Sequence, residues 1–190
     1  MDFDGFWGLV EGSAVAASDQ DERRAWLVSR LVLLPPGEIG DFAVRLDSAR
    51  ARVDTWAHWQ AATLICSGLC GMDTFFYFQA WLVGLGRSTF SAVVASPDAL
   101  ADVPHVRLLA SRGGVHAWAD DEWPDWEGLD YVANEAYAEQ FSGELAEVLA
   151  ARGLEVLLSP EPAGAQWDFA DPAEITARIP KLGALFGKVA

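Results

Sequence analysis

The chain has 190 residues, of which 52 % are hydrophobic and 22 % are charged, a composition that excludes intrinsic disorder and suffices for one continuous core. Aspartate and glutamate outnumber lysine and arginine 28 to 13, which gives a formal net charge of −15 and argues against nucleic acid or an anionic membrane as a partner. The acidic start of the sequence lacks the positive region of a secretory signal, so we expect a cytoplasmic protein.

Residues 3–15 predict a helix that is entered at Asp2. A second helix is expected to begin near Ser18, with Asp21 in the capping-box position, and to stop at residues 35–36, which are both proline.

Pro36 suits the first turn of a third helix that ends before Asp54. Residues 55–66 are nearly all apolar or small and continue the helical pattern. Residues 73–86 are apolar around most of a helix circumference, so we expect them to form the central, most buried helix.

The second half of the chain carries weaker signals, apart from a regular apolar spacing after Gly128. We expect helices over residues 87–95, 97–100, 128–141, 142–151 and 171–182, helix or loop over 103–118, an acidic loop over 120–127, a surface loop over 159–169 and a possible strand over 154–158.

These elements predict an all-α, helix-dominated fold: a single compact domain over residues 1–190, built around a buried helix at 73–86. The longest uncharged stretch, residues 55–72, contains polar side chains and glycines, so it is not expected to span a membrane.

The sequence lacks the common signatures of catalysis and of nucleotide or metal binding. There is no glycine-rich phosphate loop, no GxSxG, no HExxH and no paired CxxC. His58, Cys66 and Cys70 can share one side of a helix, but no fourth ligand stands at a recognised spacing. We therefore expect buried thiols, no metal and no cofactor.

Eight of the nine tryptophans fall into two groups of four. Those in apolar helical patterns, Trp7, Trp26, Trp56 and Trp81, are expected in the core. The others lie in or beside acidic or proline-rich loops, where packing and an interaction surface are equally good explanations. This second group consists of Trp118, Trp123, Trp126 and Trp167.

The acidic loop carries the first candidate site. We expect Trp118, Trp123 and Trp126, with Asp121 and Glu122, to form a solvent-accessible surface that binds a basic protein or peptide.

The second candidate is a pocket between helices that binds a small molecule, with or without catalysis, and uses Asp73, Tyr77, Trp81 and Glu135 as its polar groups. Asp73 also fits the role of a helix N-cap, which we favour over general acid or base catalysis.

A family resemblance supports the helical fold. It rests on Phe6-Trp7, Trp59 with Ala61-Ala62 and Leu64-Ile65, Asp73-x-Phe75-x-x-Phe78-x-Ala80-Trp81-Leu82-Val83-x-x-Gly86, Pro97-Asp98-Ala99-Leu100-Ala101, Tyr131-Val132-Ala133-x-x-Ala136-Tyr137 and Ile179-Pro180-x-Leu182. In order and spacing, the sequence resembles the bacterial, largely actinobacterial family called domain of unknown function 4240. The resemblance implies no established activity.

The sequence departs from the usual pattern of that family at two places. Gln79 stands where an arginine is expected before Ala-Trp-Leu, and Gly71-Met72 stands where an acidic pair or a serine is expected. A site that relatives build from that arginine and those acids is altered here.

Our leading hypothesis is a non-catalytic protein- or peptide-binding module, and the alternative is a small-molecule-binding protein or enzyme with an aromatic-lined pocket. The two differ in where polar groups meet. Titratable groups gathered inside one deep pocket favour the alternative, whereas exposed tryptophans on an acidic surface favour the module.

Overall fold

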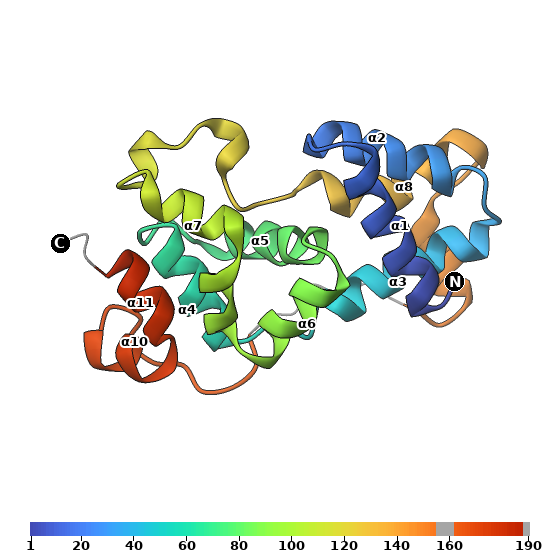
Figure 1. Cartoon of the computed structure of the whole chain (residues 1–190). Coiled ribbons are helices and arrows are strands. Elements are labelled where there is room, and N and C mark those ends of the chain that lie inside the picture. Colours follow the sequence, from blue (N-terminus) through green and yellow to red (C-terminus); the bar gives the residue numbers. More distant parts are fainter. Residues whose placement is uncertain (155–161, 188–190) are drawn as a thin grey trace. The chain divides into compact units, whose positions relative to one another are not determined.

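A computed structural model describes residues 1–154 and 162–187 and confirms the all-α prediction (Figure 1). In these residues the only β-type pairing is an isolated bridge between Thr55 and Ala163. The strand expected over 154–158 lies, except for its first residue, outside the described part of the chain. No helix in the described part has the length and apolar content needed to cross a membrane.

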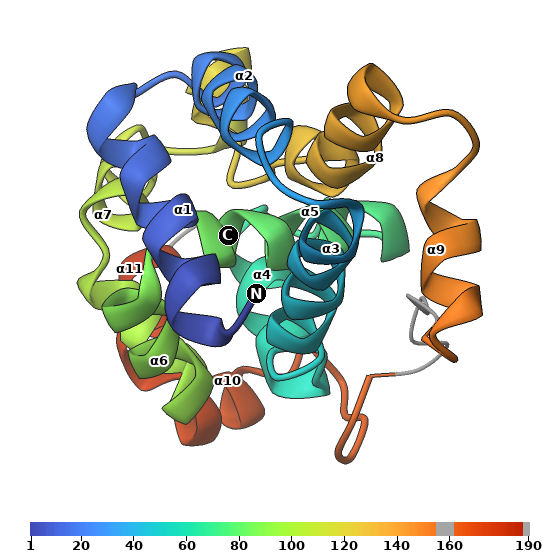
Figure 2. The ribbon, with the colours of Figure 1, turned by 90° about the vertical axis from the view of Figure 1, so that its right-hand side faces the viewer.

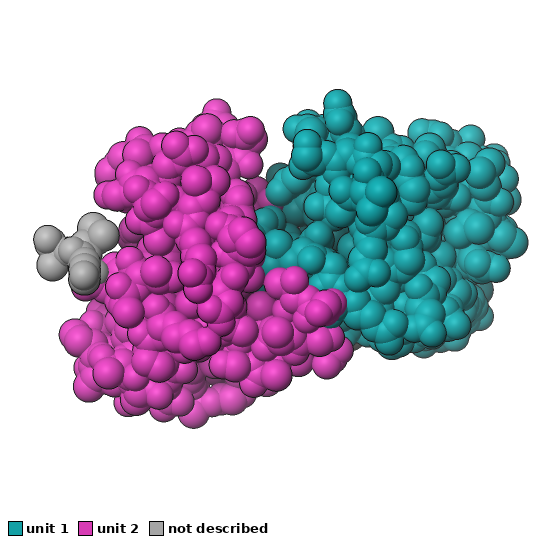
Figure 3. Space-filling view, viewed as in Figure 1, with its two compact units in different colours: residues 1–51, 80–87, 126–158 teal, residues 52–79, 88–125, 159–190 magenta. Residues whose placement is uncertain are grey.

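The chain divides into two compact units, coloured separately in Figure 3. Unit 1 comprises residues 1–51, 80–87 and 126–158, and unit 2 comprises the remaining three stretches. The units do not follow one another along the chain, because each is assembled from three separate parts of it. One boundary even falls inside the continuous helix α5 (Met72–Gly84).

Unit 1 begins with two helices whose N-termini are capped by aspartate. The Asp2 carboxylate accepts a hydrogen bond from the Gly5 amide at 2.8 Å. Asp19, the residue after Ser18, caps the second helix, which begins at Gln20 as the sequence predicts within two residues. The helices of unit 1 are α1 (Phe3–Ala16), α2 (Gln20–Leu31), α3 (Pro36–Arg50), α8 (Gly128–Gln140) and α9 (Leu145–Ala151).

Within unit 1, α8 packs against α2 and α3, and α9 packs against both α3 and α8 (Figure 2). Fully buried apolar side chains such as Phe42 and Leu129 fill the space between them. Gly40 lets α9 approach α3 closely, because a Cβ at that position would lie only 3.1 Å from Leu149 Cδ2.

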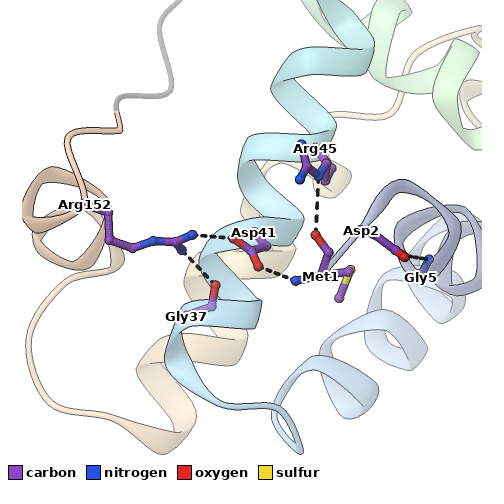
Figure 4. A network of polar contacts seen from close by, with 7 residues as sticks. All are labelled: Met1, Asp2, Gly5, Gly37, Asp41, Arg45 and Arg152. Atoms are coloured by element: carbon purple, nitrogen blue, oxygen red, sulfur yellow. Dashed lines mark hydrogen bonds and ion pairs between the residues drawn. The ribbon is translucent and has the colours of Figure 1, made fainter.

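Asp41, on α3, also fixes α9 and the start of the chain (Figure 4). Its carboxylate pairs with the Met1 amine and, at 2.7 Å, with Arg152. The same guanidinium donates to the Gly37 carbonyl at 3.0 Å. Burial alone would raise the pKa of Asp41, but these two cations lower it below the ordinary value. The end of α9 is thereby held on the first half of α3.

Unit 2 is organised around α4 (Trp56–Ile65), whose first turn is capped by the Thr55 hydroxyl. Trp59 stacks on Trp56 with centroids 5.3 Å apart, and on Phe75 at 5.1 Å. Besides α4 and the larger part of α5, the elements with most or all of their residues in unit 2 are α6 (Arg87–Ala95), η1 (Pro97–Asp102), α7 (Pro104–Ser111), η2 (Val115–Ala117), η3 (Asp120–Glu122), α10 (Pro172–Arg178) and α11 (Pro180–Phe186).

The helix α5 is as apolar and buried as its sequence predicts. Phe78 and Leu82 have no exposed surface, and Trp81 is only 6 % exposed. The helix begins at Met72, one residue earlier than expected, so Asp73 lies in the first helical turn and is not the N-cap.

Candidate functional site: a charged pocket between α3, α8 and α9

Unit 1 contains a pocket of about 460 Å³. Its walls come from the second half of α3, the first half of α8, and α9 with the residues that follow it. Most of the lining is aliphatic: Ala43, Leu46, Leu129, Ala133, Leu145, Ala146, Leu149, Ala150 and Leu154. Four polar residues interrupt it: Asp47, Arg50, Asp130 and Asn134. An apolar pocket of this size with few polar groups is typical of small-molecule sites.

The central feature of the pocket is an ion pair between Arg50 and Asp130. Arg50 Nη1 lies 3.0 Å from Asp130 Oδ1, and the two side chains are 6 % and 15 % exposed. Arg50 occupies the last turn of α3 and Asp130 the first turn of α8. Each charge therefore lies at the helix end where the macrodipole stabilises it.

Burial raises the pKa of Asp130 to about 6. Arg50 opposes this shift, and Glu127 and Asp47 add to it through their negative charge. The pKa of Asp47 is raised in the same way, by burial against the opposing effect of Arg50. The pocket thus holds two carboxylates that ionise less readily than ordinary aspartates.

The hydrogen bonding of the Asp130 carboxylate is incomplete. Asp130 Oδ2 is buried and has no hydrogen-bond partner among the described residues. The partnered Oδ1 is held by Arg50. A buried carboxylate oxygen without a donor is energetically costly, so this atom is the part of the pocket most able to gain from a bound hydrogen-bond donor.

The residues that we predicted for a pocket do not line this one. Asp73 is exposed and Tyr77 is half-buried, and both belong to unit 2. In unit 1, Trp81 is buried, whereas Glu135 forms an ion pair with Arg24 in a second, more open depression beside α2.

The predicted acidic loop is only partly a surface. Asp121 is exposed and Trp123 half-buried, but Trp118 is only 9 % exposed and lies edge-on to Trp123 with centroids 5.0 Å apart. Glu122 pairs with Arg112 and accepts a hydrogen bond from the Ala119 amide. The Ala119 amide and then Arg112 lower the pKa of this carboxyl.

Trp126 corrects our expectation of exposure, since only 2 % of it is accessible. The indole covers Gly84 so closely that a Cβ there would lie 2.6 Å from the ring. Arg23 lies over the indole, with its guanidinium carbon 4.4 Å from the ring centroid, and donates to the Gly84 carbonyl at 2.9 Å. Trp126 therefore packs inside unit 1, which its acidic neighbours in sequence do not reveal. Trp167, from the same group of loop tryptophans, is half-buried, and the guanidinium carbon of Arg178 lies 4.0 Å from its ring centroid.

The soft-ligand candidates lie in the core of unit 2. His58 Nε2 donates to the Val93 carbonyl at 3.0 Å, and Nδ1 accepts from the Thr55 hydroxyl at 2.7 Å. Burial lowers the pKa of His58, and it raises the pKa of the Cys66 thiol and that of Cys70, the latter to about 12. No three potential ligands converge on a metal site within residues 1–154 and 162–187.

Gln79, one of the two departures from the expected pattern, has a structural role in unit 2. It is buried and donates to Asp54 Oδ1 at 3.0 Å. Met72, the other departure, is 69 % exposed.

The sequence analysis missed Asp47, Arg50 and Asp130. A partial signal was present, because Asp47 and Arg50 have the i, i+3 spacing of neighbours on a helix surface, and Arg50 lies one turn after Leu46. Asp130 similarly follows Leu129 on the amphipathic helix. The sequence does not reveal that the faces of α3 and α8 that carry these residues meet, because Arg50 and Asp130 are 80 residues apart in the chain.

The fold and the pocket define an all-helical protein with charged groups set in an apolar site. The model of the family described as protein of unknown function (DUF4240) matches residues 1–139, and the chain belongs to this family. The match covers the α3 and α8 walls of the pocket, including Asp47, Arg50 and Asp130, and stops before α9. No curated protein and no solved structure matches the chain.

Proposed function

We propose that this protein binds a small molecule in the pocket between α3, α8 and α9. The observation that carries the proposal is the placement of Asp47, Arg50 and Asp130 inside an otherwise aliphatic pocket of about 460 Å³. Burying charges is costly unless they are paired, and the stability of a three-helix contact does not require them. Perturbed carboxyl pKa values in a pocket are typical of functional sites.

The test uses ligand-observed NMR with a fragment library that includes amines, acids and neutral compounds. Ala146 is exposed and lines the pocket, so Ala146→Leu narrows the pocket without disturbing the core. Ala151→Leu is the matched control, because this residue is an exposed alanine of α9 outside the pocket.

We expect hits that Ala146→Leu abolishes and Ala151→Leu retains. A library without binders, or binders that are indifferent to Ala146→Leu, would contradict the proposal.

The second candidate function is the binding of a basic protein or peptide by the acidic loop. It is supported by the exposure of Asp120 and Asp121 and by the half-buried Trp123. Trp118 and Trp126 are not part of this proposed binding surface, because both are buried. Affinity for a partner captured by pull-down should fall with Asp120→Asn/Asp121→Asn and with Trp123→Ala. Unchanged affinity in these variants would exclude the loop.

A further inference from the structure

We propose that the ligand of this pocket is an amphipathic monocation: an ammonium group recognised by Asp47 and Asp130, attached to an aliphatic body that lies along α9. The inference rests on the proposed function above and names the chemistry of its ligand.

The charge of the pocket lining favours a ligand with a positive charge. Among the described lining residues, Asp47 and Asp130 supply two carboxylates and Arg50 one guanidinium. With both carboxylates ionised, this part of the lining carries one net negative charge. A ligand with one positive charge brings the site to neutrality, whereas an anion adds a second uncompensated charge to a low-dielectric environment.

Hydrogen bonding points to the same ligand. Two carboxylates supply acceptors for it: Asp130 Oδ2 is buried without a hydrogen-bond partner among the described residues, and Asp47 lines the same pocket. An ammonium group brings three donors and no acceptor. The χ2 torsion of aspartate is broad, so Asp130 can present either oxygen to a ligand while Arg50 keeps the other.

The shape of the lining explains the aliphatic body. Around the pocket α9 contributes Leu145, Ala146, Leu149 and Ala150 and no charged side chain. The charged groups that shift the pKa of Asp130 are Arg50 and Asp47 on α3, and Glu127 just before α8. Polarity is thus concentrated on the α3 and α8 walls, opposite an apolar wall that suits a hydrocarbon chain.

The ligand series hexylamine, hexanol and hexanoate tests the proposal, because its members share one chain and differ in charge. Isothermal titration calorimetry on the full chain at pH 7.5 should rank hexylamine first. Asp47→Asn should weaken hexylamine by about 10-fold or more, since a hydrogen bond to a charged group is lost. Asp21→Asn, the same change at an exposed carboxylate outside the pocket, should leave the affinity unchanged.

A second experiment measures the affinity of the wild-type protein for hexylamine at two pH values. Hexylamine stays protonated between pH 5 and pH 7.5, so a weaker affinity at pH 5 reports the protonation of Asp130. Circular dichroism checks that Asp47→Asn is folded, and the pH arm keeps the proposal testable if it is not.

The outcomes separate the two claims. Equal binding of hexanol and hexylamine, or preferred binding of hexanoate, would overturn the cationic ligand while leaving a small-molecule pocket intact. Library hits blocked by Ala146→Leu but no binding of hexylamine would do the same. Only the absence of any pocket ligand would remove the proposed function itself.

Discussion

Two titratable side chains with little exposed surface, one in each compact unit, differ in how completely they are hydrogen-bonded. In unit 2, His58 has both ring nitrogens hydrogen-bonded, to Thr55 and to Val93, and lies within the core. In unit 1, Asp130 has one oxygen bound to Arg50 and the other without a partner, beside a pocket. Complete hydrogen bonding indicates a structural group, and incomplete hydrogen bonding at a pocket indicates a binding group.

The two groups also differ in the pH at which they destabilise the fold. Burial lowers the pKa of His58, so protonating it costs stability as the pH falls below about 6.5. Burial raises the pKa of Asp130 to about 6, so ionising it costs stability as the pH rises from about 4 through 6. Their contributions to the pH dependence of unfolding therefore have opposite signs.

The largest effect is expected from Arg50→Met. This change removes the counter-charge of Asp130, so the pKa of that carboxyl rises further, and breaking the buried pair should cost about 3–5 kcal/mol of unfolding free energy at pH 7. Urea denaturation at pH 7 measures it. The exposed pair of Arg107 and Asp102 provides the control: Arg107→Met should cost less than about 1 kcal/mol. Similar values for the two variants would contradict the account of a buried pair.

His58→Leu should cost about 1–3 kcal/mol, because the Val93 carbonyl and the Thr55 hydroxyl lose their buried partner. The difference from wild type should shrink as the pH falls below about 6.5, where the wild-type histidine itself becomes unfavourable. Urea denaturation at several pH values measures both effects. Altered affinity of the variant for ligands of the unit 1 pocket would show that His58 is more than a structural group.

Asp130→Asn removes a group that titrates. The wild type should lose about 1–2 kcal/mol relative to this variant between pH 5 and pH 8, since the ionised carboxylate is disfavoured by burial. Melting midpoints of both proteins across this range give the difference. A constant difference, or one that changes with the opposite sign, would mean that Arg50 stabilises the anion more than burial destabilises it.

The smallest effect on stability is expected from Gly40→Ala. Alanine favours the helix by roughly 0.5–1 kcal/mol, but its Cβ would lie 3.1 Å from Leu149 and crowd α9. The net change should stay below about 1 kcal/mol, while ligand affinity should change several-fold because a wall of the pocket moves. Gly8→Ala is the control, with no atom near the added methyl group. If Gly40→Ala leaves ligand affinity unchanged, the position of α9 does not determine ligand binding.

The sequence predicts those features of the structure that depend on residues close together in the chain. Helix limits such as Asp2 and Pro36 were readable because caps and prolines act within one turn. The burial of Trp126 was not, because it depends on Gly84 and Arg23, which are distant in sequence. The same holds for the pocket, whose charged residues come from two helices 80 residues apart.

The most direct test of the central claim is the titration of Asp130 followed through its side-chain carboxyl resonance by ¹³C NMR. The resonance is assigned by its absence in Asp130→Asn. A functional carboxyl held in an apolar pocket predicts a midpoint near pH 6, moving to lower pH when hexylamine is added. A midpoint near 4, the ordinary value for aspartate, unchanged by the amine, would contradict the account.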